Sequence, residues 1–273
     1  MTSYRRRSAA PFAACILALV ALGATSTARA QQQTKAQARC IDALNGATRG
    51  VVSAQAKTNA LCLRYLDRAP LESCITSDPR GLTEKARLKA ISAVAGRCEV
   101  APDFGFTSAA TANASAVANS IALMHDVFGE DLSIAAMHGV SDPDVASCQR
   151  AGHKGYEGLF RAHLEAFDGC KRAGLTSGTI DSRAALAQCV NVMTLAASPP
   201  IEKKYVKLQK ALSKPCRFNQ PQEAFPGPCS SPDRAACILQ RAFCRACLLL
   251  NEVDDLDVSC DDADDGQTNG SCP

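Results

Sequence analysis

The stretch CIDALNGATRGVVSAQAKTNALC, residues 40–62, begins and ends with cysteine. Small and apolar side chains recur along it at alternating spacings of three and four residues, the pattern of a helix that packs along one face; they are Cys40, Leu44, Ala47, Val51, Ala54, Thr58 and Cys62. At 100° per residue, the two cysteines share a face and lie about 33 Å apart along the axis. The stretch therefore predicts one long helix with a cysteine at each end.

The segment that follows supplies a return helix with matching cysteines. Prolines at positions 70 and 79 break the chain, and Thr83 then predicts a capped helix over residues 83–97. Two antiparallel helices of similar length bring their outer cysteines together at one end and their inner cysteines together at the other. The first hairpin, residues 31–100, is thus expected to hold the disulfides Cys40–Cys98 and Cys62–Cys74.

The four-cysteine pattern occurs a second time, which indicates an internal repeat. Residues 142–228 begin with Asp142-Pro143-Asp144, a strong helix start, and again place two cysteines 22 positions apart. The return segment predicts helices over residues 182–197 and 201–213, separated by two prolines. By analogy, the second hairpin is expected to hold Cys148–Cys216 and Cys170–Cys189.

Two further segments complete the predicted fold. Residues 101–141 contain a connecting helix and a linker, and residues 229–273 form a small Cys-rich acidic segment with a helix to about Asn251. Cys247–Cys260 is the pair we expect there, while the remaining connectivity of Cys229 to Cys272 stays open. The fold class is therefore all-α: two disulfide-stapled antiparallel helical hairpins, a connecting helix and a Cys-rich C-terminal segment.

Residues 1–30 read as a secretory signal peptide, cleaved after Ala30. Three arginines precede an apolar run that is too short to span a bilayer, and Ala28-Arg29-Ala30 is a small-x-small cleavage site. Fourteen cysteines remain after cleavage, an even number that favours disulfides over free thiols or a thiol-bound metal. We therefore expect an exported protein, in the periplasm or outside the cell, with no membrane span.

Charge excludes one class of partner. The full chain has 30 basic and 27 acidic residues, and the leader holds four arginines, so the mature chain is near neutral at −1. A nucleic-acid binder would be strongly basic. Charge is uneven along the chain, with 11 basic and 6 acidic residues in 31–100 but 3 and 9 in 229–273. Opposite ends of opposite sign suit docking on each other or on different partners, although solvated helix faces also explain such runs.

The C-terminal sequence CDDADDGQTNGSC, residues 260–272, is the candidate metal site. It resembles the Asp-rich, Gly-containing calcium loops of extracellular repeats, and this resemblance implies a calcium ion held by Asp261, Asp262, Asp264, Asp265 and Asn269. Ala263 stands at a ligand position of the EF-type loop and the distant Glu is absent, so that pattern is not met. A solvated acidic tail is the competing interpretation.

No catalytic motif is present, so no catalytic residue and no other cofactor is predicted. In general character the chain resembles the uncharacterised Cys-rich exported helical proteins of Gram-negative bacteria, a group whose resemblance transfers no activity and no site residue. We expect a non-catalytic exported binding or structural module, with another envelope or extracellular protein as partner. The alternatives are a carrier of a small apolar ligand between the hairpins and a calcium-binding surface protein.

Overall fold

A computed structural model describes residues 32–64, 70–135, 142–216, 221–230 and 232–272. The expected signal peptide lies outside these residues. Every regular element among the described residues is helical, which confirms the all-α prediction. The elements are α1 (Lys35–Cys62), α2 (Leu71–Ser77), α3 (Leu82–Ala95), α4 (Ala109–Phe128), α5 (Leu132–Ala135), α6 (Pro143–Ser177), α7 (Arg183–Ala187), η1 (Gln188–Met193), α8 (Pro199–Ser213), η2 (Pro221–Ala224), η3 (Pro228–Ser230), α9 (Arg234–Asp254) and α10 (Cys260–Asp265).

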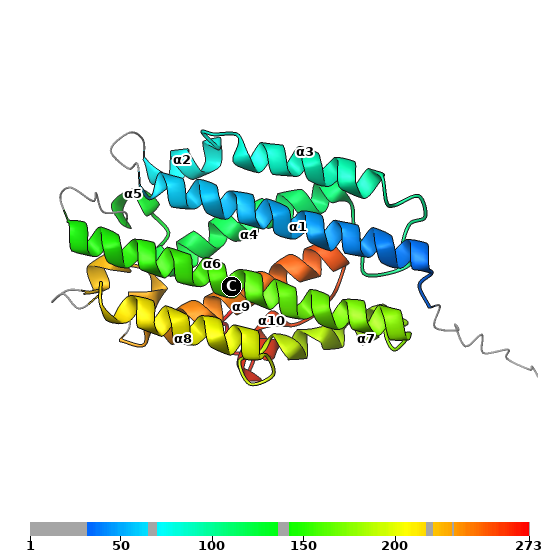
Figure 1. The fold of residues 1–273 in the computed structure, drawn as a ribbon. Coiled ribbons are helices and arrows are strands. Elements are labelled where there is room, and N and C mark those ends of the chain that lie inside the picture. The colour runs from blue at the N-terminus through cyan, green and yellow to red at the C-terminus, as the bar shows by residue number, and fades with distance from the viewer. Residues whose placement is uncertain (1–31, 65–69, 136–141, 217–220, 231, 273) are drawn as a thin grey trace, which may run out of the picture.

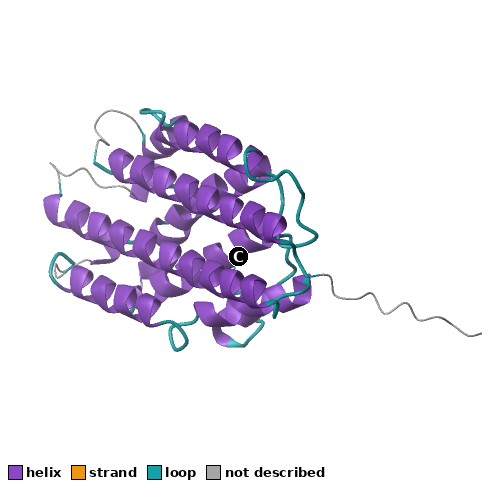
Figure 2. Ribbon diagram, turned by 45° about the vertical axis from the view of Figure 1, so that its right-hand side comes forward, coloured by secondary structure: helices purple, strands orange, loops and turns teal. Residues whose placement is uncertain are grey.

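The long helices form two layers. Helices α3, α1, α6 and α8 lie side by side in that order, and α4 and α9 lie behind them (Figures 1 and 2). Helix α4 packs against α1, and α9 packs against both α4 and α6. One core runs between the layers, and its largest buried side chains include Phe128, Tyr156, Phe160 and Phe167. No described helix covers the outer surface of this four-helix layer (Figure 2).

The cysteines form seven disulfides among the described residues. The four hairpin pairs are those expected from antiparallel geometry, with Cα–Cα distances from 4.6 to 5.7 Å. Cys247–Cys260 is also the pair that the sequence predicts. The two pairs that the sequence left open are Cys229–Cys237 and Cys244–Cys272.

Each hairpin has the same buried polar contact near its inner disulfide. Gln55 lies seven residues before Cys62, and its Nε2 donates to the Ile75 carbonyl at 3.1 Å. His163 lies seven residues before Cys170, and its Nδ1 donates to the Met193 carbonyl at 2.9 Å. In both hairpins a buried side chain of the long helix thus holds the backbone of the return segment.

The N-terminus of α3 differs from the expectation. Thr83 was expected to cap the helix, but α3 begins at Leu82, and Thr83 is buried against Thr58 and Gln55. The carboxylate of Asp78 accepts the backbone N–H groups of Leu82 (3.0 Å) and Glu84 (2.9 Å). A carboxylate interacts more favourably than a hydroxyl with the positive end of the helix dipole, so Asp78 caps α3 in place of Thr83. The Thr83 side chain is then free to be buried.

The return of the second hairpin is also less regular than predicted. The expected helix over residues 182–197 is divided into the short α7 and the 3₁₀ element η1, which ends at Met193. Cys189, within η1, is tied to Cys170, and the Met193 carbonyl is held by His163. These two attachments fix the tighter turn. Helix α8 then begins at Pro199, where a missing N–H costs nothing.

Helix α9 lies at the centre of the molecule, not at its edge. The sequence suggested a small C-terminal segment, yet α9 buries Ile238, Ala242, Ala246 and Leu249 completely. The reason is its position between α4 and α6, where small side chains permit close packing. Helix α10 packs on α9, and most described residues from Asp261 onward are partly or fully exposed.

Candidate functional site

Two grooves run along the outer surface of the four-helix layer, one on each side of α1. The α1–α6 groove has a volume of about 630 Å³ and the α1–α3 groove about 730 Å³. They share Ser53 and Lys57, which lie on the ridge of α1 between them. Their floors are built from small residues such as Ala60 and Ala151 in the first groove and Gly50 and Ala90 in the second. Small side chains at these contacts leave the space above them unfilled.

Cationic side chains surround both grooves, and we call this surface the basic face. Three acidic residues line the grooves, Asp42, Glu157 and Glu165. Ten basic residues line them: Arg39, Lys57, Arg64, Lys85, Lys89, Arg97, Arg150, Lys154, Arg161 and Lys204. Eight of them belong to α1, α3, α6 and α8, and Arg64 and Arg97 lie just after α1 and α3. The positive charge is concentrated here because helices that are distant in the sequence pack side by side.

Few of these cations are neutralised. Arg161 pairs with Glu165 at 3.3 Å, and Asp42 is already paired with Arg172 at 3.2 Å. Around the α1–α6 groove, five cations form no ion pair with any residue that the structure describes: Lys57, Arg64, Arg150, Lys154 and Lys204. The described residues therefore do not cancel the positive potential over this groove.

A recessed polar pair lies on the wall of the α1–α6 groove. His153 and Glu157 are one helical turn apart in α6, are 5% and 9% exposed, and approach to 3.7 Å between Nε2 and Oε1. His153 Nε2 and both carboxyl oxygens of Glu157 have no hydrogen-bond partner among the described residues. Burial without a partner leaves the hydrogen-bonding capacity of all three atoms unused.

Both members of this pair are uncharged at neutral pH. Burial raises the pKa of Glu157 to about 8, although the charge of Arg161 opposes the rise. Burial also lowers the pKa of His153 to about 3, and the positive charge of Arg64 lowers it further. A neutral carboxylic acid beside a neutral imidazole can both donate and accept hydrogen bonds. The groove thus combines a charged rim with a neutral polar wall.

The sequence did not predict this site. Its local signal is a histidine and a glutamate four residues apart, with basic residues before, between and after them at 150, 154 and 161. A histidine and a carboxylate one helical turn apart are common on solvated helix faces, so this spacing alone does not indicate a binding site. The basic residues of α1 that complete the site belong to a helix about 100 residues earlier.

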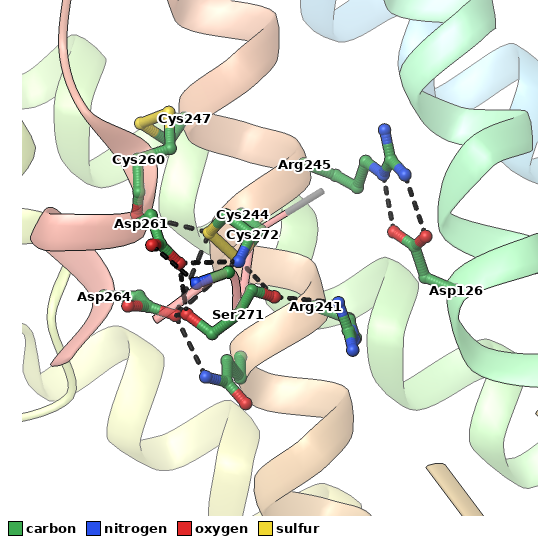
Figure 3. The surroundings of a disulfide bond; sticks show 12 residues. Asp126, Arg241, Cys244, Arg245, Cys247, Cys260, Asp261, Asp264, Ser271 and Cys272 are labelled. Atoms are coloured by element: carbon green, nitrogen blue, oxygen red, sulfur yellow. Dashed lines mark hydrogen bonds and ion pairs between the residues drawn. A yellow bond between two sulfur atoms is a disulfide. The ribbon is translucent and has the colours of Figure 1, made fainter. Parts of the chain in front are cut away.

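The carboxylates of the predicted calcium loop mostly bind the loop itself. Asp261 Oδ1 accepts the backbone N–H of Cys272 (3.0 Å) and the Ser271 hydroxyl (2.8 Å), and its Oδ2 accepts the N–H of Gly270 (2.8 Å) (Figure 3). These hydrogen bonds hold the pKa of Asp261 well below its usual range. Asp264 Oδ2 accepts Gln240 Nε2 of α9 at 3.0 Å and lies 2.7 Å from the Ser271 hydroxyl oxygen, whose single proton it shares with Asp261.

The other predicted ligands are also engaged or lie outside the description. Asp262 accepts the Thr268 hydroxyl, and Asn269 Oδ1 accepts the N–H of Ser271 at 2.9 Å. The side chain of Asp265 is outside the described part of the chain. The structure therefore brings Asp261 and Asp264 together at Ser271, where they close the loop against α9, while Asp262 and Asn269 hold other parts of the loop.

One cluster in the described residues has metal-like spacing, and its chemistry does not suit a metal. Cys244, Asp264 and Cys272 offer atoms within 4.8 Å of one another. Cys244 and Cys272 are joined as a disulfide, however, and a disulfide sulfur is not the thiolate that binds zinc or copper (Figure 3). This cluster is a structural cross-link between α9 and the C-terminal residues.

No family model, no curated protein and no solved structure matches the chain. Among the described residues, each helix is too short or too polar to cross a bilayer. The site's own chemistry therefore carries the functional argument.

Proposed function

We propose that this protein is an exported, non-catalytic binding module that engages an anionic partner through its basic face. The observation that carries the proposal is the excess of ten cations over three acids around the two grooves, in a mature chain of nearly balanced charge. A concentrated field of one sign attracts partners of the other sign and orients them as they approach. An envelope or extracellular protein with an acidic surface has the matching chemistry.

Binding accounts for the groove better than catalysis does. His153 and Glu157 are the perturbed ionisable groups of the α1–α6 groove, yet neither forms a hydrogen bond to a serine, threonine or other nucleophile among the described residues. A general base must lie within hydrogen-bond reach of the group that it activates. The rim consists of long lysine and arginine side chains, which suit the attraction of an anionic partner.

The disulfide-rich scaffold suits an oxidising compartment outside the cytoplasm. Seven disulfides connect segments up to 68 residues apart, and such cross-links persist in oxidising compartments. Together with the leader sequence, they support export to the periplasm or the medium. The matching Gln55 and His163 contacts, one in each hairpin, support an origin of α1–α3–α4 and α6–α8–α9 as two copies of one unit.

Salt-dependent binding to a model polyanion tests the proposal. Fluorescently labelled poly-L-glutamate is titrated with the mature protein, and its anisotropy is measured from 20 mM to about 500 mM NaCl, over which screening should weaken binding strongly. The double variant Lys57→Glu/Lys89→Glu reverses two charges on the basic face. We expect it to bind at least tenfold more weakly than the parent at low salt.

A matched control keeps the same net charge change. Lys203 and Lys207 are exposed on the outer side of α8, away from both grooves. Lys203→Glu/Lys207→Glu should retain most of the affinity for poly-L-glutamate, with unchanged far-UV circular dichroism for both variants. An equal loss in the two double variants would show that net charge, and not the basic face, governs binding.

The two alternative functions have weaker support. A purely apolar ligand between the hairpins would want an enclosed dry cavity, whereas the α1–α6 groove is open and lined by cations. A calcium ion at the C-terminal loop would compete for the carboxylate oxygens of Asp261 and for Oδ2 of Asp264, which already accept hydrogen bonds, while Oδ1 of Asp264 has no partner among the described residues. Native mass spectrometry with and without a chelator tests the calcium alternative directly, since a mass lost on chelation would establish it.

A further inference from the structure

Three buried polar atoms on one wall of the α1–α6 groove have no hydrogen-bond partner among the described residues, and a ligand could supply one. They are Nε2 of His153 and the two carboxyl oxygens of Glu157. A buried polar group that is left unsatisfied destabilises the fold, because its hydrogen bonds to water are lost and not replaced. A fold rarely places two such side chains side by side at random, and functional sites are where this cost is met by a bound molecule.

The charges around the pair select the sign of the ligand. Arg64, at the end of α1, lowers the pKa of His153 through its charge, and Arg150 and Lys154 line the same groove. A bound cation would be repelled by all three. A carboxylate would be attracted by them and would accept their N–H groups. The pair therefore belongs to an anion site and not to a metal site.

The floor of the groove indicates that the anion carries an apolar body. Ala56, Ala60 and Leu63 from α1 face Ala151 and Gly158 from α6 across the groove. Its volume of about 630 Å³ lies within the usual 300–1,000 Å³ of sites for drug-sized ligands. An inorganic ion would fill a small part of this space and leave the apolar floor in contact with water.

We propose that the α1–α6 groove binds an amphipathic carboxylate. The rim cations hold its charged oxygens, the His153–Glu157 pair completes their hydrogen bonds, and the alkyl chain lies along the alanine floor. The inference rests on the proposed function, because it takes the basic face as the binding surface and adds the ligand class of one groove. The α1–α3 groove has no comparable buried pair among the described residues.

Protonation of Glu157 gives the site a pH signature. Below a pKa of about 8 the neutral acid donates a hydrogen bond to the ligand carboxylate, and above it the ionised form repels the ligand. The titratable and charged groups that line the groove with Glu157 are Lys57 of α1 and Arg64 just after it, Arg150, His153, Lys154, Arg161 and Glu165 of α6, and Lys204 of α8. Glu157→Gln keeps a donor and removes the titration.

Isothermal titration calorimetry with dodecanoate below its micelle concentration is the test. The parent protein should bind one dodecanoate per chain at pH 7 and bind it about tenfold more weakly at pH 9, since the protonated fraction of Glu157 falls about tenfold over that range. Glu157→Gln should bind equally at both pH values. Lys154→Glu, an exposed change at the rim, should weaken binding at pH 7, and Lys203→Glu on the outer side of α8 should not.

The outcomes separate this inference from the proposed function. Binding of poly-L-glutamate without binding of dodecanoate overturns the inference and leaves the proposed function standing, whereas loss of both overturns both. Competition by inorganic phosphate at the same concentration overturns the role of the apolar body. An unchanged pH dependence in Glu157→Gln overturns the assignment of the site to this pair.

Discussion

The ammonium group of Lys171 in α6 lies 2.5 Å from the carboxylate of Asp254 in α9, and both side chains are fully buried. The same nitrogen donates to Asn45 Oδ1 of α1 at 3.2 Å and to the Gly105 carbonyl at 3.1 Å. An ammonium has three donors, and here all three are used. One side chain therefore joins both helical layers and the turn that precedes α4.

Replacement of Lys171 by methionine should destabilise the protein by about 3–5 kcal/mol. The change leaves the Asp254 carboxyl group buried without its counter-charge and also removes the donor of Asn45 and Gly105. The measurement is the free energy of unfolding in urea, followed by far-UV circular dichroism with the disulfides intact.

Two further variants define what that result means. Lys171→Met/Asp254→Leu removes both charges and should recover part of the lost stability. Arg183→Met breaks the Arg183–Asp255 pair, whose side chains are more than half exposed, and should cost less than about 1 kcal/mol. Equal losses for Lys171→Met and Arg183→Met would contradict a special role for the buried pair.

Stability should fall as pH rises from 6.5 to 8, because of Glu157. Its pKa is about 8 in the folded protein and near 4.5 when unfolded, so in this interval the folded state binds more protons. As the pH rises toward 8, the free energy of unfolding therefore falls by up to about 2 kcal/mol through Glu157. Asp168, whose pKa burial raises only to about 6, contributes little in this interval. His153 and His163 oppose the decline by roughly 1 kcal/mol at most, because burial lowers their pKa values in the folded protein while the unfolded imidazoles, with a pKa near 6.5, are still partly protonated at the lower pH.

Urea unfolding at pH 6.5 and pH 8 checks this expectation. All fourteen cysteines of the described residues are in disulfides, so thiol exchange does not obscure the comparison. Glu157→Gln should show no decline between the two pH values, and the two buried histidines should instead give it a rise of roughly 1 kcal/mol or less. A decline that persists in this variant would assign the titration to another group.

The cysteine spacing made the hairpins predictable from sequence. A pair of cysteines 22 positions apart fixes their face and distance on a helix, and antiparallel packing then determines which partners meet. No such local rule placed Lys171. A lysine one residue after Cys170 reads as exposed, because lysines are rarely buried without a partner, and the partner Asp254 is 83 residues away.

The candidate site was less predictable for the same physical reason. The excess positive charge of residues 31–100 is visible in the sequence. That these basic residues lie beside those of α6 and α8 depends on how the helices pack. The spacing of His153 and Glu157 is local, whereas their burial is set by α1 and α8. The number of carboxylates in the C-terminal loop predicted a calcium site. The sequence does not show that the folded loop supplies N–H and hydroxyl donors to these carboxylates.

Two glycines of α6 should respond oppositely to alanine. A Cβ at Gly155 would lie 2.2 Å from Cδ1 of Leu208, a buried residue of α8, while a Cβ at Gly169 would meet nothing within 4 Å. Gly155→Ala should cost about 1–2 kcal/mol through overpacking against α8. Gly169→Ala should stabilise by about 0.5–1 kcal/mol through helix propensity. Urea unfolding of both variants decides, and stabilisation by Gly155→Ala would show that α6 and α8 pack less closely.

The long-range and short-range disulfides should differ in what their removal costs. Cys148–Cys216 closes 68 residues and Cys229–Cys237 closes 8, and each contains one fully buried cysteine. Because a cross-link mainly restricts the unfolded chain, the cost grows with the logarithm of loop length. Cys148→Ala/Cys216→Ala should lose about 4 kcal/mol, and Cys229→Ala/Cys237→Ala about 2–3 kcal/mol.

The intact protein provides the reference for that comparison. Its mass should be 14 Da below that of the reduced mature chain, because each of the seven disulfides removes two hydrogens. Each double variant should fall 12 Da below its own reduced chain. A larger loss of stability for the short pair than for the long one would show that native-state contacts of Cys229, and not chain entropy, dominate its contribution.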